Sequence, residues 1–433
     1  MTVGRPDKLV ALGDAVENAA SNMSWPDWLS LDHSQKPPQT HIDESTLNRQ
    51  WQGLMEEVHK EKAPTDAQIQ NEETQLRQIE NSVAANADMR KVFDDAIPQL
   101  HKRALSRHLS NTEVSRFYEQ EGKLLLTHSS FVADRDRIMA ATELMHQVAD
   151  PVVTSQGMHD TCTMAGLEHK LTVQKPSVVA EMVTSLALND KWVGHDGKTI
   201  AIDKESLSPK AEEQSFLPGD GDRSFASQLF QLGAMNDLMQ HFDPRWRYLQ
   251  HDEHWYRYLV GDAFGGTGEL VVNPQGKSTG FADVTPNFFD TSGGPTSWAT
   301  GEELTRLTGE TYGIMQGAKY RYTNIPKHDM PAPGIDKDAD VFYFATPQEL
   351  ENRLQQLKNS NGLPIMIAVA AEGLYRVRSG EKPSAGNEPD HIICIDDYTP
   401  AQGGKPAKVL LHNNWTQSFN DWTTVENFFP VVS

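Results

Sequence analysis

The feature of this sequence that most restricts its fold is a change in composition and apolar spacing at Asp150-Pro151. Between residues 42 and 149 Gly and Pro are scarce, and apolar side chains such as Val114, Phe117 and Leu124 recur at the three-to-four spacing of amphipathic helices. Beyond this point Gly and Pro are frequent, and short β-type runs alternate with helical segments. Helices that come early and strands that come late predict an α+β fold, not a doubly wound sheet.

Short local signals mark where several of these elements begin. Ser110 and Glu113 form a capping box at a helix start, and Thr346, Pro347 and Glu349 form a second one. Four or five helices are expected in the helical region. Later helices are expected over residues 162–173, 176–188, 225–239, 301–307 and 347–357, and strands over 199–202, 270–272, 341–344, 365–369, 391–395 and 409–411.

This change in composition, together with the different composition of the first 41 residues, divides the chain into three expected segments. Residues 1–41 are rich in Trp, Pro and Ser and are expected to be irregular. Residues 42–149 are expected to form an all-α domain with a regulatory or partner-binding role, whose partner the sequence does not identify. Residues 150–433 are expected to form the α+β domain. A chain of 433 residues is long enough for two or three domains with full cores.

The charge and hydropathy of the chain argue against two classes of partner. The sequence has 60 Asp and Glu against 39 Lys and Arg, a net charge of −21. Such a surface repels phosphate, so nucleic acid and anionic membranes are not expected as partners. The sequence contains neither the apolar run of a signal peptide nor one long enough to cross a bilayer. We therefore expect no integral membrane segment, and either a cytoplasmic location or export by a leaderless route.

The two cysteines, Cys162 and Cys394, are too few for a disulfide framework or a four-thiolate zinc site. Cys162 lies between the break at Pro151 and an apolar-periodic segment that ends before Pro176, which places it at or near a helix N-terminus. The unpaired N–H groups and the positive end of a helix stabilise a thiolate there. Gln156, six residues upstream, can donate an amide hydrogen bond to an oxyanion beside the backbone N–H of the cysteine.

A thiolate nucleophile needs a base, and the base needs an orienting group. The C-terminal region offers both in a predicted hairpin of two apolar runs around a Gly-rich turn. If the hairpin is centred near residue 402, His391 faces Asn413 across the ladder with Cβ atoms ~5 Å apart. The amide then holds the imidazole in the tautomer whose other nitrogen faces the thiol. By strand alternation Asn414 and Cys394 point to the opposite face, so Cys394 is assigned to the core.

These residues resemble the hallmark of the papain-like cysteine peptidases, with an organisation closer to calpain-type catalytic cores. That family has a Gln six residues before a helix-initiating Cys, a distant His on a strand, and Asn-x-Trp on the next strand. Here Gln156, Cys162, His391 and Asn413-Asn414-Trp415 occur in that order. The resemblance covers residues 150–433.

The resemblance implies a role for each matching residue. It implies a core of two lobes with a cleft between them, and a catalytic site without a metal. The implied roles are nucleophile for Cys162, general base and acid for His391, orientation of the imidazole for Asn413, oxyanion donor for Gln156, shielding of the His–Asn hydrogen bond for Trp415, and a shielding or substrate-binding role for Gly157.

The chain departs from the family pattern at two places. Thr163 stands where the family has a bulky aromatic residue after the Cys. Residues 416–422 (TQSFNDW) replace the usual Gly-rich tail after Asn-x-Trp. These departures bear on substrate specificity more than on the nucleophilic machinery.

The predicted fold is α+β: a papain-like two-lobed cysteine peptidase core, with a helical lobe and an antiparallel β lobe, preceded by the all-α N-terminal domain. The predicted function is hydrolysis of amide bonds in protein or peptide substrates by a Cys-His-Asn triad with a Gln oxyanion donor. Two alternatives stay open: a transglutaminase-like acyltransferase or glutamine deamidase on the same triad, and a non-catalytic interaction protein on this scaffold.

Other groups of candidate ligands have simpler interpretations. His251 and His254 offer metal-binding side chains, but His-x-x-His without further ligands is typical of a solvated helix face. Residues 261–268 (GDAFGGTG) are not followed by the Lys-Ser/Thr pair of a phosphate-binding loop.

Two further groups of residues contain metal-binding side chains. A zinc cluster of His159, Cys162 and His169 would consume the nucleophile and lacks a fourth ligand. The acidic residues 336–340 (DKDAD) fit an exposed turn, with calcium as the alternative, as in calpain-type cores. No cofactor is otherwise expected.

Overall fold

The computed structural model describes residues 44–60, 63–107, 109–251, 268–276, 278–279, 297–309, 314–317, 341–379 and 391–432. These residues belong to one compact unit, which starts at Asp43. The irregular segment expected over residues 1–41 lies outside them.

The helical region of the sequence forms five helices in the part of the chain that the structure describes. At one of the predicted capping boxes, the Ser110 Oγ accepts a hydrogen bond from the Glu113 N–H at 3.1 Å. The last helix of the region stops before Pro151, as the sequence predicted. The five helices are α2 (Glu44–Val58), α3 (Asp66–Val83), α4 (Ala87–Arg107), α5 (Asn111–Leu126) and α6 (Asp134–Ala149).

These helices share a core with the three long helices that follow, α7 (Cys162–Gln174), α8 (Pro176–Asn189) and α9 (Phe225–Phe242). Helix α5 packs on α8, and α6 packs on α9. The boundary expected at residues 149 and 150 therefore falls inside one continuous apolar core. A separate role for residues 42–149 stays a prediction.

The largest sheet has six strands in the order β11-β10-β9-β8-β6-β7. The pairs from β8 to β11 are antiparallel, as expected, whereas β6 runs parallel to both β7 and β8. Helix α12 (Pro347–Asn359) makes the crossover that lets β7 and β8 run in the same direction. The strands are β6 (Ile314–Gly317), β7 (Val341–Phe344), β8 (Ile365–Val369), β9 (His391–Thr399), β10 (Lys408–His412) and β11 (Trp422–Thr424).

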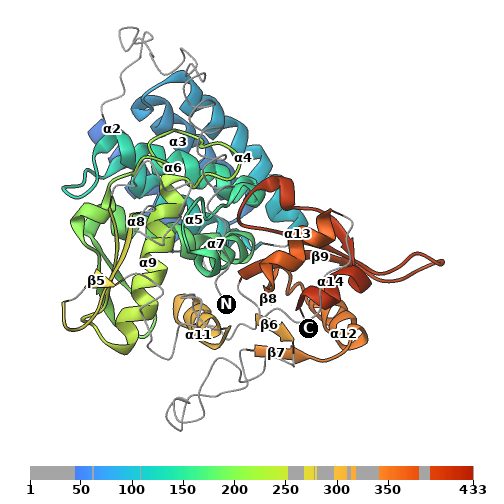
Figure 1. Ribbon diagram of the computed structural model, residues 1–433. Helices are drawn as coiled ribbons and strands as arrows, with labels where there is room; N and C mark the ends of the chain where they lie inside the picture. The colour runs from blue at the N-terminus through green and yellow to red at the C-terminus, as the bar shows by residue number, and fades with distance from the viewer. Residues whose placement is uncertain are drawn as a thin grey trace, which may run out of the picture. The chain divides into compact units, whose positions relative to one another are not determined.

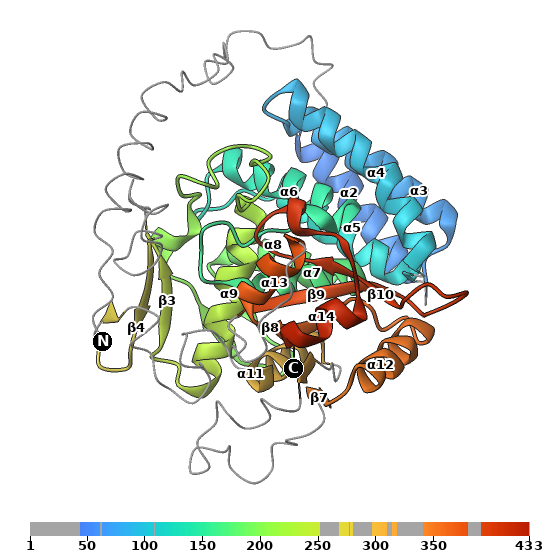
Figure 2. The ribbon, with the colours of Figure 1, turned by 45° about the vertical axis from the view of Figure 1, so that its right-hand side comes forward.

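The two central strands of this sheet are buried on both faces, because each face packs on a different layer of helices. Ile392 and Cys394 of β9 belong to the large core that contains α7. Ile393 and Ile395 belong to a smaller core with α12, α13 (Ala371–Arg378) and α14 (Val425–Val432). Both views place α7 centrally, between α8 and the strands β8 and β9 (Figures 1 and 2). The sheet thus connects the helical half of the molecule to its C-terminal part.

Shorter elements complete the described structure. Most expected helices and strands are found within one or two residues of their predicted ends; α11 starts four residues earlier than expected, and β9 extends four residues further. None of the described helices is long and apolar enough to span a membrane. The remaining elements are η2 (Pro151–Val153), β1 (Lys191–Val193), β2 (Thr199–Ala201), η3 (Lys204–Leu207), β3 (Arg247–Gln250), β4 (Glu269–Val272), β5 (Ser278–Thr279), α11 (Ser297–Thr308) and η7 (Gln417–Phe419).

The contact between α2 and α5 provides a test of the helical core. Trp51 of α2 is fully buried, and a Cβ added at Gly122 of α5 would overlap its indole ring. Alanine is the better helix former by about 1 kcal/mol, but overpacking of this kind costs about 1–3 kcal/mol or more. We expect Gly122→Ala to lower the free energy of unfolding, measured by urea titration followed through tryptophan fluorescence.

The matched control is Gly53→Ala. Gly53 also lies in a helix, α2, but nothing lies within 4 Å of the Cβ that the substitution adds. Helix propensity then acts alone, and this variant should be more stable by up to about 1 kcal/mol. Equal effects of the two substitutions would contradict the packing described.

Candidate active site

Cys162 is the first residue of α7, where the sequence placed it. Thr161 before it has non-helical dihedral angles (φ −109°, ψ 25°), and its carbonyl accepts the N–H of Ala165 at 2.9 Å. The cysteine is partly buried. Its thiol therefore lies at the positive end of a 13-residue helix, in the position that favours a thiolate.

Helix α7 lies against the sheet along one face, with a contact at each turn. Cys394 donates its S–H to the carbonyl of Gly166 at 3.4 Å, and the Lys170 ammonium donates to the carbonyl of Pro364 at 2.7 Å. A Cβ at Gly166 would come within 3.3 Å of the side chains of Ile392 and Met366. The glycine thus allows α7 to approach β8 and β9 closely, and Cys394 is a core residue, as its strand position predicted.

Asn414 joins the start of α7 to the start of β9. Its side chain is fully buried, and its Nδ2 donates to the carbonyl of Cys162 at 3.0 Å and to the carbonyl of Ile392 at 3.2 Å. The Asn414 amide therefore bridges the backbone of Cys162 and the backbone of Ile392, the residue next to His391. Asn414 points away from the imidazole, as strand alternation requires, toward α7.

His391 and Asn413 form the hydrogen bond that the sequence analysis expected, between Nε2 and Oδ1 at 3.0 Å. The same Oδ1 accepts the backbone N–H of Trp415 at 3.2 Å, which fixes the amide with its oxygen toward the ring. The imidazole must then carry its proton on Nε2, so Nδ1 is the basic nitrogen. Burial lowers the pKa of His391 to about 4, against the opposing effect of the Asn413 hydrogen bond.

Trp415 covers this hydrogen bond. Its ring stacks on the imidazole of His391, with centroids 4.0 Å apart and planes 18° apart. Tyr375 stacks on Trp415, with ring centroids 5.4 Å apart, and is 52% exposed. The aromatic pair therefore separates the buried His–Asn contact from solvent.

The predicted strand register, with His391 directly opposite Asn413, is wrong. The tight turn has Gly403 and Gly404 at its two central positions, both with positive φ, and a β-bulge follows between Leu410 and Leu411. His412 consequently pairs with Cys394, so Asn413 lies two positions from the point opposite His391. A shift of two keeps both side chains on one face, which is why the hydrogen bond still forms.

Gln156 lies in the loop that leads to Cys162 and is almost fully buried. Its backbone N–H donates to the carbonyl of Asn414 at 2.9 Å, and its Nε2 donates to the carbonyl of His159 at 2.6 Å. The second N–H of this amide has no acceptor among the described residues. The loop and the strand end that carries Asn413 are therefore held together by direct backbone contact.

Gln231 of α9 fixes both ends of this loop. Its Nε2 donates to the carbonyl of Ser155 at 2.9 Å, and its Oε1 accepts the hydroxyl of Thr161 at 2.6 Å. The same Nε2 donates to Glu168 of α7 at 2.9 Å. One side chain thus sets the distance between the residue before Gln156 and the residue before Cys162.

A buried charge cluster supports the middle of the loop. His159 is fully buried, with Nε2 at 3.5 Å from Glu212 and 3.4 Å from Glu213. Burial and Arg223 lower the pKa of His159, but the surrounding carboxylates outweigh both and raise it to about 9. Gly157 has φ +64°, and a Cβ there would overlap Glu212, so the loop needs glycine at this position.

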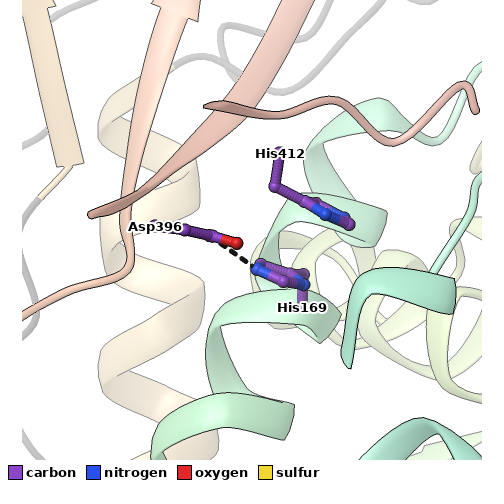
Figure 3. Close-up of side chains that lie close together, drawn as sticks. All are labelled: His169, Asp396 and His412. Atoms are coloured by element: carbon purple, nitrogen blue, oxygen red, sulfur yellow. Dashed lines mark hydrogen bonds and ion pairs between the residues drawn. The ribbon is translucent and has the colours of Figure 1, made fainter. Parts of the chain in front are cut away.

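Two groups in the described part of the chain bring possible metal ligands together. Nε2 of His169 lies 2.8 Å from a carboxylate oxygen of Asp396, and the His169 ring stacks on that of His412, with centroids 3.6 Å apart and planes 7° apart (Figure 3). An ion in the plane of one ring lies outside the plane of the other, so the stacked pair is not arranged as a ligand set. In the second group, the surrounding carboxylates raise the pKa of His159, and Arg223 already pairs with Glu213 at 2.7 Å.

The other candidate metal ligands do not form a cluster with Cys162. Among the described residues, His159 and His169 belong to the two separate groups just described, and neither group includes Cys162. His254, most of residues 261–268 and the acidic residues 336–340 lie outside the described residues. The exposed turn expected at 336–340, and calcium as its alternative, are therefore not tested.

The residues that the sequence analysis missed act over long separations in the chain. Asn414 was assigned only to a face, whereas Gln231 and the Glu212–Glu213 pair were not predicted at all. A Gln on an apolar helix and a pair of acidic residues in a loop carry no local signal of their partners. Only the consecutive Asn413-Asn414 pair gave a hint, because it supplies an amide to each face of a strand end.

Comparisons of this chain with protein-family models, with curated proteins and with solved structures found no match.

The different surroundings of the two cysteines predict different reactivity. Cys394 is fully buried, and burial raises the pKa of its thiol well above the usual value, whereas Cys162 is partly exposed at a helix start. Iodoacetamide should therefore alkylate Cys162 in the native protein and Cys394 only after unfolding, as measured by mass spectrometry of peptides. Comparable labelling of Cys394 in the native protein would contradict this arrangement.

Proposed function

We propose that this protein is a cysteine-type hydrolase with a papain-like core that cleaves amide bonds in protein or peptide substrates. The observation that carries the proposal is the double role of the Asn413 oxygen, which accepts from both His391 and the backbone of Trp415. This arrangement leaves Nδ1 of the shielded His391 imidazole as the base. The Asn414 amide connects the backbone next to His391 with the start of the helix that carries Cys162. A buried histidine with only a packing role has no need of this arrangement.

In the proposed mechanism the Cys162 proton passes to Nδ1 of His391, and the thiolate forms a bond to the carbonyl carbon. The oxyanion receives hydrogen bonds from the Gln156 amide and the Cys162 N–H. His391 then gives its proton to the leaving nitrogen as the C–N bond breaks. A water that loses a proton to His391 hydrolyses the thioester and restores the thiol.

The proposed core would have α7 and its neighbouring helices as the helical lobe and strands β8 to β11 as the β lobe. Support comes from the opposite burial of neighbouring β9 residues: Ile392 packs toward α7, and Ile393 packs toward α13 and α14. His391 at the first position of β9 is then at the edge where the two layers meet. The helices of residues 42–149 would serve a regulatory or partner-binding role.

A mixture of unstructured peptides, analysed by mass spectrometry, tests the proposal. Wild type should generate new termini, and Cys162→Ala should generate none. Asn413→Ala should lower the rate on the order of 10²-fold, because the imidazole loses its orientation. The rate should fall as the pH drops through about 4, since a protonated His391 cannot accept the thiol proton.

Cys394→Ala is the matched control and should retain activity. A labelled primary amine in the same mixture separates the alternatives. Incorporation of the amine without chain cleavage would replace the peptidase proposal by acyl transfer on the same residues. No turnover of either kind, together with a Cys162 thiol no more reactive than a free cysteine, would favour the non-catalytic alternative.

A further inference from the structure

The segment of residues 416–422, in which the chain departs from the family pattern, packs directly against the candidate active site. The ring of Phe419 meets the ring of Trp415 edge-on, with centroids 6.2 Å apart and planes 86° apart. It meets the ring of Tyr375 in the same way, at 5.2 Å and 88°. The guanidinium of Arg378 lies 4.1 Å from the centroid of the Phe419 ring. The segment is therefore held beside the aromatic pair that covers the candidate base.

The same segment supplies a side chain that holds the backbone of Asn413. This residue lies one position beyond the end of β10, where the register pairs of the sheet have ended. A buried N–H group that lacks an acceptor costs about 1–3 kcal/mol. Asn420 provides the acceptor, because its Oδ1 lies 2.7 Å from the backbone nitrogen of Asn413. The Asn420 side chain therefore takes the place of a neighbouring strand at this position.

The other end of the Asn420 amide is held as well. Because its oxygen accepts an N–H, its nitrogen faces Nδ1 of His412, 3.2 Å away, and donates to it. His412 then carries its proton on Nε2. Burial and the neighbouring His169 lower the pKa of His412 to about 3, so the ring is neutral near pH 7 and is able to accept this hydrogen bond.

The ring of His412 is fixed in turn by His169 of α7, on which it stacks with centroids 3.6 Å apart (Figure 3). Both nitrogens of His169 lie against oxygen atoms. Nδ1 is 3.0 Å from the carbonyl of Pro151, and Nε2 is 2.8 Å from the carboxylate of Asp396. The ring cannot turn without breaking one of these contacts. A continuous series of contacts therefore runs from α7 through the stacked rings to the Asn420 amide.

We propose that Asn420 is a positioning residue of the candidate active site. It holds the backbone of Asn413 so that the side-chain oxygen of Asn413 faces the imidazole of His391, and it does not touch the substrate. The inference rests on the proposed function. Because the same oxygen also accepts the N–H of Trp415, loss of Asn420 should loosen the orientation of the Asn413 amide without abolishing it. The residues that replace the Gly-rich tail of the family would thus supply part of the catalytic geometry.

The tautomer of His391 tests this inference without turnover. Burial lowers the pKa of this imidazole to about 4, so the ring is neutral near pH 7. Its proton should lie on Nε2 when the Asn413 oxygen faces the ring, and on Nδ1 when the amide nitrogen faces it. NMR of protein with isotopically labelled histidine distinguishes the two forms, and the signals are assigned by their loss in His391→Ala. We expect the Nε2–H form alone in wild type and a mixture in Asn420→Ala.

The kinetic constants for peptide cleavage give a second readout. In Asn420→Ala, kcat should fall about tenfold, less than in Asn413→Ala, and KM should change by no more than about twofold, because Asn420 does not touch the substrate. Asn420→Asp keeps the acceptor for the Asn413 N–H and should retain both kcat and the Nε2–H form of His391. Asn420→Leu keeps the volume of the side chain without the acceptor, so it replaces Asn420→Ala if the alanine variant does not fold.

The matched control is Asn427→Ala, because Asn427 is an exposed asparagine of α14. This substitution should leave both readouts unchanged. The Nε2–H form alone in a folded Asn420→Ala or Asn420→Leu variant would overturn the inference, and so would an Asn420→Asp variant that loses as much kcat as Asn420→Ala. Failure of the proposed function gives a different result: wild type cleaves no peptide, while the NMR comparison still shows whether Asn420 orients Asn413.

Discussion

The buried amide of Asn414 is the contact on which the rest of the candidate site depends. Its Nδ2 donates to the carbonyl of Cys162 at the start of α7 and to the carbonyl of Ile392 at the start of β9, so two distant segments of the chain meet there. Both acceptors are backbone carbonyls, so the amide fixes the main chain itself and does not depend on flexible side chains. An unsatisfied carbonyl in this buried position would cost about 1–3 kcal/mol, which gives the contact a strong geometric preference.

The surroundings of this contact limit the movement of each partner. Gly166 allows α7 to lie close to β9, and the Cys394 S–H and the Lys170 ammonium hold the later turns of the helix on the sheet. On the other side, Gln231 and the charges around His159 hold the loop that leads to Cys162. The loop therefore gains its fixed shape mainly from buried polar contacts with residues that are far away in the sequence.

Much of the fold could be predicted from the sequence because its signals are local. Apolar spacing, the Ser110 cap and the break before Pro151 gave helices α5 and α6 their limits, and the position of Cys162 at a helix start followed from the same kind of pattern. The face that each strand residue occupies also followed from simple alternation. Cys394 and Asn414 were assigned to the face opposite His391, and the structure places both of them there, toward α7.

The remaining features depend on contacts that no local pattern contains. The predicted register of β9 and β10 was wrong because the turn is centred on Gly403 and Gly404, and because a β-bulge then shifts the pairing by one residue. A model of a symmetric hairpin centred near residue 402 includes neither effect. The parallel pairing of β6 and the partners of Gln231 depend on how distant segments pack. Alternation survived the error in register because the displacement was an even number of residues.

The central claim is that the fold couples Cys162 to His391. The ultraviolet absorbance of the thiolate, taken as the difference between wild type and Cys162→Ser over a pH titration, measures this coupling directly. Transfer of the thiol proton to Nδ1 of His391 would pair the thiolate with an imidazolium, and this pair titrates as a unit. We therefore predict a midpoint below the ordinary cysteine pKa of about 8.5, and a midpoint about one unit or more higher when His391→Ala is added to both proteins. A midpoint near 8.5 that does not change on loss of His391 would contradict the claim.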